Sequence, residues 1–402
     1  MKIGIVGMGW VAAGAVRSRC PEWAMLHAVR KWLIMLALVA ASCGGESDAP
    51  IAPRQQWTAT EANAWYVQQP WLAGSNFVPS TAVNQLEMWQ ADTFDEDTID
   101  RELGWAAELG FNTMRVFLHD LLWAEDPSGF LNRIERFLAI ADSHGIATMF
   151  VLFDGVWDPF PALGEQPEPQ PHTHNSRWVQ SPGAEILGDA DRHDELEGYV
   201  KGVIGRFRAD PRVVVWDLFN EGDGSNLPYF AVELPPEQKR PGAEQLATKA
   251  FEWARAMGPT QPITSGVYDL NADDPADLTS LNQLVLAESD IVTFHSYEPP
   301  SVVQNLIAFL REYGRPILCT EYMARPEDST FEGVMPIFKE EKIGAYNWGF
   351  VVGKTQTNYH WLSWIDMSPE RANPWFHDIL NADGTPYDSD ETTLIRQLTG
   401  TE

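Results

Sequence analysis

The chain has 402 residues, a formal net charge of −29 and 44% hydrophobic residues, an ordinary composition for a globular protein. Such an excess of acid repels phosphate backbones, so we expect no nucleic-acid partner. The three cysteines, Cys20, Cys43 and Cys319, are too far apart in sequence for a zinc site, and no disulfide framework, metal or cofactor is expected.

The N-terminal 42 residues are expected to be a leader and not part of the fold. An apolar run over 32–41 follows two basic residues and precedes small residues, which is the layout of a secretory signal. The run is too short to be a permanent membrane helix. The first 24 residues carry a glycine pattern like a dinucleotide-binding turn but lack the βαβ unit it requires, so we interpret Met25 as the true start.

The segment from Ala40 to Cys43 resembles a bacterial lipobox, in which the cysteine carries the lipid. Ordinary signal cleavage after Ala41 is the alternative. Residues 43–56 are polar with glycine and proline and predict a tether. The protein is therefore expected to be exported, as an outer-membrane or periplasmic lipoprotein or as a secreted protein. Any membrane contact would be through a lipid on Cys43.

From Trp57 onward, short apolar runs alternate with amphipathic stretches, a pattern typical of buried strands and helices. Gly110 and Gly145 stand where two of the helices should end. The predicted strands cover 71–77, 112–118, 146–153, 212–219, 262–267, 290–295, 316–320 and 343–350. The predicted helices cover 99–109, 131–144, 191–208, 242–257, 276–286, 301–313, 331–340 and 391–398.

Apolar strands that alternate with helices indicate a parallel sheet with helical crossovers. Eight such units over residues 57–402 predict one α/β domain, a (β/α)8 TIM barrel with enlarged loops at its C-terminal, catalytic face. A doubly wound sheet is the alternative. The long loops, 155–189, 222–240 and 351–390, follow the third, fourth and eighth strands. Loops of this length shape a site, and we expect a pocket or short groove.

Two predicted strands end on a carboxylate. Glu221 follows Asn220 at the end of the fourth strand, and Glu321 ends the seventh strand. In a barrel these strand ends lie across the mouth from each other, so both acids can point inward. Two facing carboxylates are the groups that cleave a glycosidic bond, because one protonates the leaving oxygen while the other attacks or activates water.

These motifs resemble clan A glycoside hydrolases, in particular the cellulase-like family 5, over residues 70–380. Three further positions match the family pattern in the right order. Arg115 lies in the segment Phe-Asn-Thr-Met-Arg of the second strand, and the sixth strand ends in a His-x-Tyr motif. The eighth strand carries a tryptophan that would form the floor of the sugar site. The matching residues of these last two motifs are His295, Tyr297 and Trp348.

The resemblance implies a retaining mechanism, with Glu221 as general acid/base and Glu321 as nucleophile. Arg115 would keep the pKa of Glu321 low, and Tyr297 would donate a hydrogen bond to it. Asn220 would contact the sugar 2-hydroxyl. Each of these residues also has a structural alternative, as a loop cap, a barrel ion pair or a buried core side chain.

The sequence departs from the family at the end of the third strand, where Asp154 stands in place of the common histidine. His119, after the second strand, is expected to fill part of that space, and Asp154 is a candidate for binding a substrate hydroxyl. Trp157 and Trp178 lie in the long loop after the third strand and are candidates for stacking on sugar rings. Other loop tryptophans, Trp123, Trp361 and Trp364, are further candidates for such stacking.

The sequence therefore predicts an enzyme, a retaining glycoside hydrolase that acts on β-linked oligo- or polysaccharides of the β-glucan, β-mannan or xylan type. Its partner is a carbohydrate, and a monomer is favoured. The alternatives are a transglycosylase that uses the same residues, a glycan-binding lipoprotein with a decayed site, and a metal-dependent barrel hydrolase. The last would need clustered metal ligands at the strand ends, which the sequence does not offer.

Overall fold

The computed structural model describes residues 51–271 and 273–401. The predicted leader and most of the predicted tether lie outside the described residues, so export and lipid attachment stay predictions. The last residues of that tether are bound to the folded domain, because Arg54 forms an ion pair of 2.5 Å with Asp290 and donates to the carbonyl oxygens of Pro259 and Gln261. Among the helices of the described residues, none is long and apolar enough to span a membrane.

Eight parallel strands form one sheet in the order β5-β4-β3-β2-β1-β8-β7-β6. A parallel bridge from Val267, just after β5, to Phe294 in β6 joins the two ends of that order and closes the barrel. The predicted TIM-barrel fold is confirmed. The strands are β1 (Ala73–Asn76), β2 (Thr113–Phe117), β3 (Ala147–Asp154), β4 (Val213–Asn220), β5 (Ile263–Thr264), β6 (Val292–His295), β7 (Ile317–Glu321) and β8 (Gly344–Asn347).

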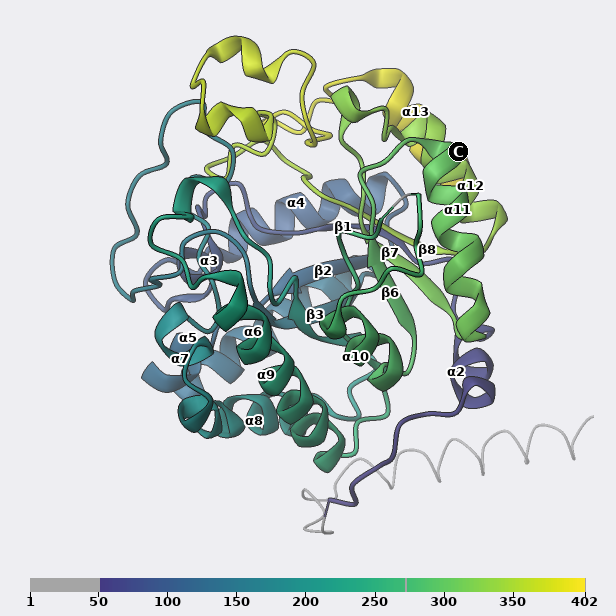
Figure 1. Ribbon diagram of the computed structural model, residues 1–402. Helices are drawn as coiled ribbons and strands as arrows, with labels where there is room; N and C mark the ends of the chain where they lie inside the picture. Colours follow the sequence, from purple (N-terminus) through teal and green to yellow (C-terminus); the bar gives the residue numbers. More distant parts are fainter. Residues whose placement is uncertain (1–50, 272, 402) are drawn as a thin grey trace, which may run out of the picture. The chain divides into compact units, whose positions relative to one another are not determined.

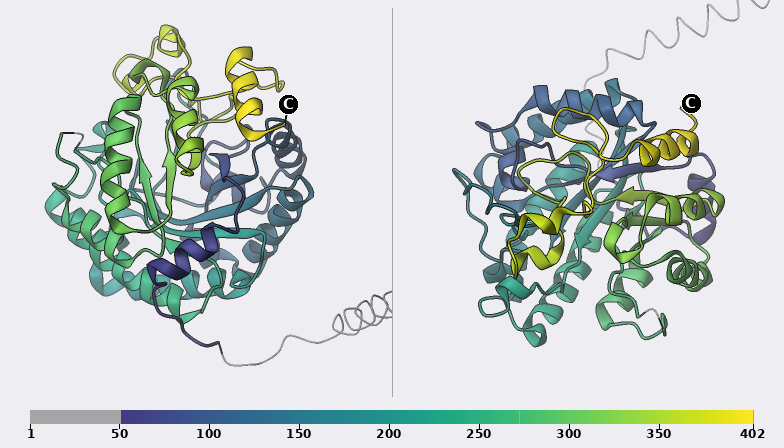
Figure 2. Two further views of the ribbon diagram at one scale, coloured as in Figure 1. Left: turned by 90° about the vertical axis from the view of Figure 1, so that its right-hand side faces the viewer. Right: turned by 90° about the horizontal axis from the view of Figure 1, so that it is seen from above.

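Helices surround the strands (Figures 1 and 2). Those following the strands are α3 (Gln85–Trp89) and α4 (Glu96–Glu108), α5 (Asp120–Glu125) and α6 (Pro127–Ser143), α7 (Ala184–Leu187) and α8 (Glu197–Phe207), α9 (Pro236–Ala256), α10 (Ser280–Glu288), α11 (Pro300–Leu310), α12 (Phe331–Glu340) and α13 (Ser389–Thr399), with α2 (Ala59–Tyr66) preceding β1. Short 3-10 turns are η1 (Ala190–Leu196), η2 (Leu227–Tyr229), η3 (Arg311–Tyr313), η4 (Arg325–Glu327), η5 (Trp361–Trp364) and η6 (Pro369–Ala372).

The helices that the sequence did not predict are mostly short and depend on local caps. The side chain of Asn84 accepts a hydrogen bond from the backbone N–H of Glu87 and caps the start of α3. The side chain of His119 accepts a hydrogen bond from the backbone N–H of Leu121 and caps the start of α5. Such helices are too short to show a periodic apolar face. The helix α9 begins at Pro236, six residues before the predicted start, because proline is accommodated in the first helical turn.

The two ends of the barrel differ in chemistry. At the N-terminal end, Ala62 of α2 packs with Leu72, Met149 and Leu318 in an apolar cluster. At the C-terminal end the strands finish on polar residues, among them Asp154, Asn220, His295 and Glu321. The segment between β8 and α13 lies over this end, as the view from above shows (Figure 2). The long loops and the strand ends together position the candidate site.

Candidate active site

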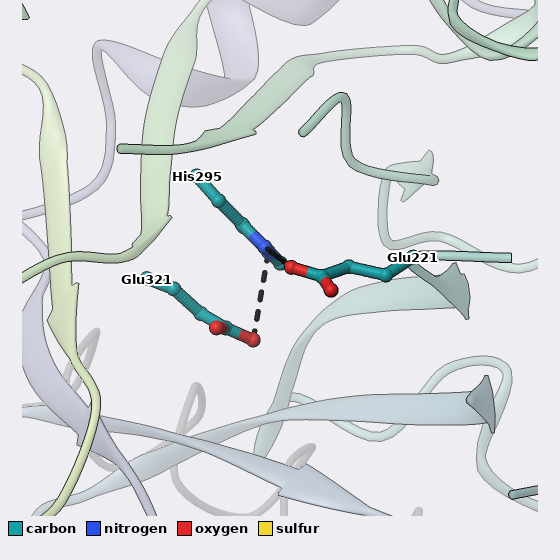
Figure 3. Close-up of side chains that lie close together, drawn as sticks. All are labelled: Glu221, His295 and Glu321. Carbon is teal, nitrogen blue, oxygen red and sulfur yellow. Dashed lines mark hydrogen bonds and ion pairs between the residues drawn. The ribbon is translucent and has the colours of Figure 1, made fainter. Parts of the chain in front are cut away.

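Glu221 and Glu321 approach each other across the barrel mouth. Glu321 is the last residue of β7, and Glu221 directly follows β4 with a positive φ of 42° that turns the chain away from the strand. One carboxylate oxygen of each, together with a ring nitrogen of His295, lies within 4.8 Å of the others (Figure 3). The close packing at this turn needs glycine, because a side chain at position 155 would meet the backbone oxygen of Glu221.

Arg115, on β2, holds the floor of the site together. Its guanidinium is fully buried and donates to the Glu321 carboxylate at 2.9 Å, to Asp217 at 2.8 and 3.0 Å, to Asn220 at 2.7 Å and to Asn76 at 2.9 Å. Every partner is an acceptor, as a buried cation requires. The fork of Arg115 therefore orients Glu321 and Asn220 at the same time.

The other oxygen of Glu321 accepts a hydrogen bond of 2.8 Å from the hydroxyl of Tyr297. Burial, and then the adjacent Glu321 charge, raise the pKa of Tyr297 well above its ordinary value, so its hydroxyl stays protonated and donates. Both carboxylate oxygens of Glu321 are thus bound by a donor, which fixes the direction of the carboxylate.

His295, at the end of β6, lies between the two acids. Its Nδ1 is 2.8 Å from a Glu221 carboxylate oxygen, and its Nε2 is 3.7 Å from Glu321 (Figure 3). Burial lowers the pKa of His295 to about 4, so the ring is neutral near pH 7. Its Nε2 has no hydrogen-bond partner among the described residues.

The carboxyl groups of Glu221 and Glu321 are both buried, but their hydrogen-bond partners differ. Burial raises the pKa of Glu221 to about 7; Arg115 opposes this, while Asp269 and Asp223 add to it. Burial also raises the pKa of Glu321, but Arg115 and Tyr297 bind it directly and favour its charged form. The arrangement therefore favours a protonated Glu221 beside an ionised Glu321.

Asp154, at the end of β3, lies beneath the site and binds residues that support it. It accepts hydrogen bonds from Asn220 at 3.0 Å, from the indole of Trp178 at 2.7 Å and from the backbone of Val156 at 3.2 Å. Burial raises the pKa of Asp154 to about 7. It is fully enclosed and lines neither of the two hollows described next, so it positions Asn220.

The first hollow has a cavity volume of about 300 Å³ and mostly apolar walls. Trp157 stacks on Trp364 at 5.8 Å, and Tyr229 meets Trp364 edge-on at 5.7 Å, so the loops after β3, β8 and β4 join at one wall. The lining residues are Val156, Trp157, His174, Asn175, Asn220, Glu221, Ser225, Asn226, Leu227, Pro228, Tyr297, Glu321, Trp348, Trp361, Leu362, Trp364 and Ile365.

Two expected sugar-contacting residues do not reach this hollow. Trp178 is 2% exposed and packs edge-on against Phe117 and Trp348, so its indole supports the floor from beneath. His119 is fully buried, and its Nδ1 accepts the backbone N–H of Leu121 as the cap of α5. No hydrogen bond or ion pair joins His119 to Glu221 or Glu321 in the described part of the chain.

A second hollow, of about 600 Å³, lies on the other side of Glu221. It is formed by the segments after β5, β6 and β7, and it shares Glu221, Tyr297 and Trp361 with the first hollow. Apart from Glu221, its acids were not predicted from the sequence, because they lie in loops and belong to no motif. The lining residues are Glu221, Tyr268, Asp269, Leu270, His295, Ser296, Tyr297, Glu298, Pro299, Leu306, Pro326, Glu327, Asp328 and Trp361.

Glu221, His295 and Glu321 are close enough together to offer three ligand atoms to a metal ion. The Arg115 guanidinium, 2.9 Å from Glu321, disfavours a second cation at the same carboxylate. The donor set of two carboxylates bridged by a neutral imidazole fits acid–base and nucleophilic chemistry better.

The model of the family described as Cellulase (glycosyl hydrolase family 5) matches residues 74–354. No curated protein sequence matches the chain. Solved structures share the fold at low identity. An exo-β-1,4-mannosidase, Op5Man5 from Opitutaceae bacterium strain TAV5, has a TM-score of 0.56 and 19% identity over 82% of this chain, which spans 60% of that enzyme. GH5_18 from Streptomyces cattleya, solved with GlcNAc, has a TM-score of 0.53 and 15% identity over 82% of this chain and 80% of that one.

Proposed function

The chain belongs to glycoside hydrolase family 5, and from this membership and the geometry of the site we propose that Glu221 and Glu321 cleave β-linked glycosides by double displacement. The observation that carries the proposal is the separation of their carboxylate oxygens, within 4.8 Å. Retaining enzymes keep the two carboxyl groups about 5–5.5 Å apart, whereas inverting enzymes leave room for a water between them.

In the first step Glu321 attacks the anomeric carbon, and Glu221 gives its proton to the leaving oxygen. Glu321 suits the role of nucleophile because Arg115 and Tyr297 stabilise its charge and aim it. Glu221 suits the role of acid because its pKa is raised to about 7 and it makes no direct contact with a Lys or Arg side chain of the described residues.

In the second step the same groups act in reverse. Glu221, now ionised, takes a proton from water, and the hydroxide equivalent displaces Glu321 from the anomeric carbon. His295 contacts Glu221 at 2.8 Å and can stabilise its charged form as a hydrogen-bond donor. Asn220, held by Arg115 and Asp154, is oriented toward the first hollow, where it would bind the sugar 2-hydroxyl.

The shape of the first hollow supports action on a short glycone. Glu321 lines it together with Trp348 and Asn220, so the sugar that is attacked would lie here. The Trp157–Trp364 stack and Tyr229 join three loops at its wall, and we propose a pocket or short groove closed at that side. The sugar remains one of the β-glucan, β-mannan or xylan types.

The proposal is tested with Glu321→Ala and Glu221→Ala on a panel of aryl β-glycosides and β-linked oligosaccharides. Each variant should lose about 10³-fold or more of kcat on natural leaving groups. Added azide should restore turnover and give the α-glycosyl azide with Glu321→Ala but the β-glycosyl azide with Glu221→Ala, because azide replaces a different group in each.

The matched control is Glu108→Ala, an exposed acid at the end of α4, which should keep the parent rate. Wild-type rates of Glu321→Ala on every substrate that the parent cleaves would show the assignment wrong. Turnover that gives mainly transfer products with sugar acceptors would favour the transglycosylase alternative, and absence of turnover by the parent would favour the decayed, glycan-binding one.

A further inference from the structure

The two hollows divide the substrate between them, and this inference rests on the proposed function. The attacked sugar must lie against the nucleophile, and Glu321 lines only the first hollow. The acid must reach the bond between sugar and leaving group, and Glu221 lines both. The second hollow is therefore the space that the leaving group enters.

The walls of this second hollow are acidic. Besides Glu221, four carboxylates line it: Asp269 after β5, Glu298 after β6, and Glu327 and Asp328 after β7. No Lys or Arg is among its lining residues. Arg325, which precedes Pro326 of the lining, already pairs with Glu391 at 2.6 Å, and Arg240 pairs with Asp223 at 2.5 Å.

Three of these carboxylates have no compensating partner. Glu327 lies 3.1 Å from the His360 ring, but Asp269, Glu298 and Asp328 make no ion pair or side-chain hydrogen bond with the described residues. All three are exposed side chains of the loops after β5, β6 and β7. Their charge is therefore available to a bound group.

The side chain of His295 also lines the second hollow, but its Nε2 is closed off from solvent and lies 3.7 Å from Glu321. What the second hollow offers to a leaving group is therefore a set of unneutralised negative charges next to Glu221.

We propose that the second hollow selects leaving groups by charge: it accepts those that carry an amine or no charge and disfavours those that carry a carboxylate, sulfate or phosphate. Glu298 and Asp328 are the specificity-determining residues. A unit charge at about 6 Å from a carboxylate in water changes binding by about threefold, and two such carboxylates multiply the effect.

The test uses three aryl β-glycosides of the preferred sugar that differ only in the para substituent of the leaving phenol: aminomethyl, hydroxymethyl or carboxymethyl. A methylene spacer keeps the phenols similar as leaving groups, so kcat/KM reports mainly the charge. We expect the order ammonium, neutral, carboxylate, with a spread of about tenfold or more at low salt. The spread should shrink in 0.5 M salt, as expected for partly exposed charges.

Glu298→Gln and Asp328→Asn should each reduce the ratio between the ammonium and carboxylate substrates, and the double variant should bring it to about twofold. The matched control is Glu108→Gln with Asp142→Asn, one exposed Glu and one exposed Asp near the N-terminal end of the barrel, which should leave the ratio and the rates unchanged.

A parent ratio within twofold would overturn the inference, and so would a ratio that the double variant does not move or that the control moves equally. In either case hydrolysis of the neutral glycoside by the parent would leave the proposed function standing. If the parent hydrolyses none of the three, nor any substrate of the panel above, the proposed function fails and the inference fails with it.

Discussion

The two hollows that meet at Glu221 are built from different chemistry. The first has mostly apolar walls with tryptophan, leucine and isoleucine side chains, and two carboxylates, Glu221 and Glu321, line it. The second is lined by five carboxylates and few large apolar side chains. The contrast shows that one carboxyl group, Glu221, can face two environments; under the proposals above, the first would enclose a sugar ring and the second would select leaving groups by charge.

The contrast also bears on the acid itself. The pKa of Glu221 is raised first by burial and further by two acids: Asp269, which lines the second hollow, and Asp223, which accepts a hydrogen bond from Tyr268 of that hollow. The first hollow supplies the opposite influence through Arg115 beneath it. The acidic side thus contributes to keeping Glu221 protonated at neutral pH.

The largest expected effect comes from replacing Arg115, which binds Glu321 and Asn220 beneath the first hollow. Arg115→Met leaves Asp217 and Glu321 buried without their cation, so we expect unfolding free energy to fall by about 3–5 kcal/mol and kcat to fall by at least about 10²-fold. Denaturant unfolding and steady-state kinetics measure the two. Arg192→Met, at an exposed pair with Glu195, should leave stability nearly unchanged. Equal losses in both variants would contradict the assigned role.

A smaller effect is expected on pH dependence. Glu221 must be protonated to act as acid, so kcat/KM should fall about tenfold per pH unit above its pKa of about 7. Asp269→Asn removes a charge that raises this pKa, so the descending limb should move to lower pH. A substrate with a strongly activated leaving group needs no acid and should show a weaker limb. If the descending limb of the pH profile keeps its position in both the Asp269→Asn and the Glu221→Gln variant, a group other than Glu221 causes it.

The smallest effect is expected at the wall of the first hollow. Trp364→Ala removes the stacking partner of Trp157, so KM for short oligosaccharides should rise by about tenfold, while charge selectivity at the leaving group stays as in the parent. Product analysis on polymer should show short products from the parent and longer ones from the variant. Trp375→Ala is the control, since Trp375 stacks on Tyr387 and lines neither hollow. Release of only long fragments by the parent would refute the pocket.

Local pattern was enough to identify the barrel and the acids. Each strand has a continuous apolar run, and its burial follows from that run alone, so six strands were found within two residues of their ends, while β5 and β8 each end three residues earlier than predicted. Glu221 and Glu321 were found because barrel topology places strand ends at one mouth. Arg115, Tyr297 and His295 then followed from family spacing, and the structure brings all three to the acids.

What the sequence could not determine is where loop side chains point and what they meet. Trp157 and Trp178 lie in the same loop, yet one lines the hollow and the other is buried beneath it, because Asp154 binds the indole of Trp178. His119 caps α5, a helix too short for an apolar periodicity to predict it from the sequence. The four acids of the second hollow other than Glu221 lie up to 59 positions apart in sequence, from Asp269 to Asp328, and form one surface only when three loops converge. Strand burial is a local property of the chain, whereas these contacts depend on the closure of the barrel, which only the tertiary structure decides.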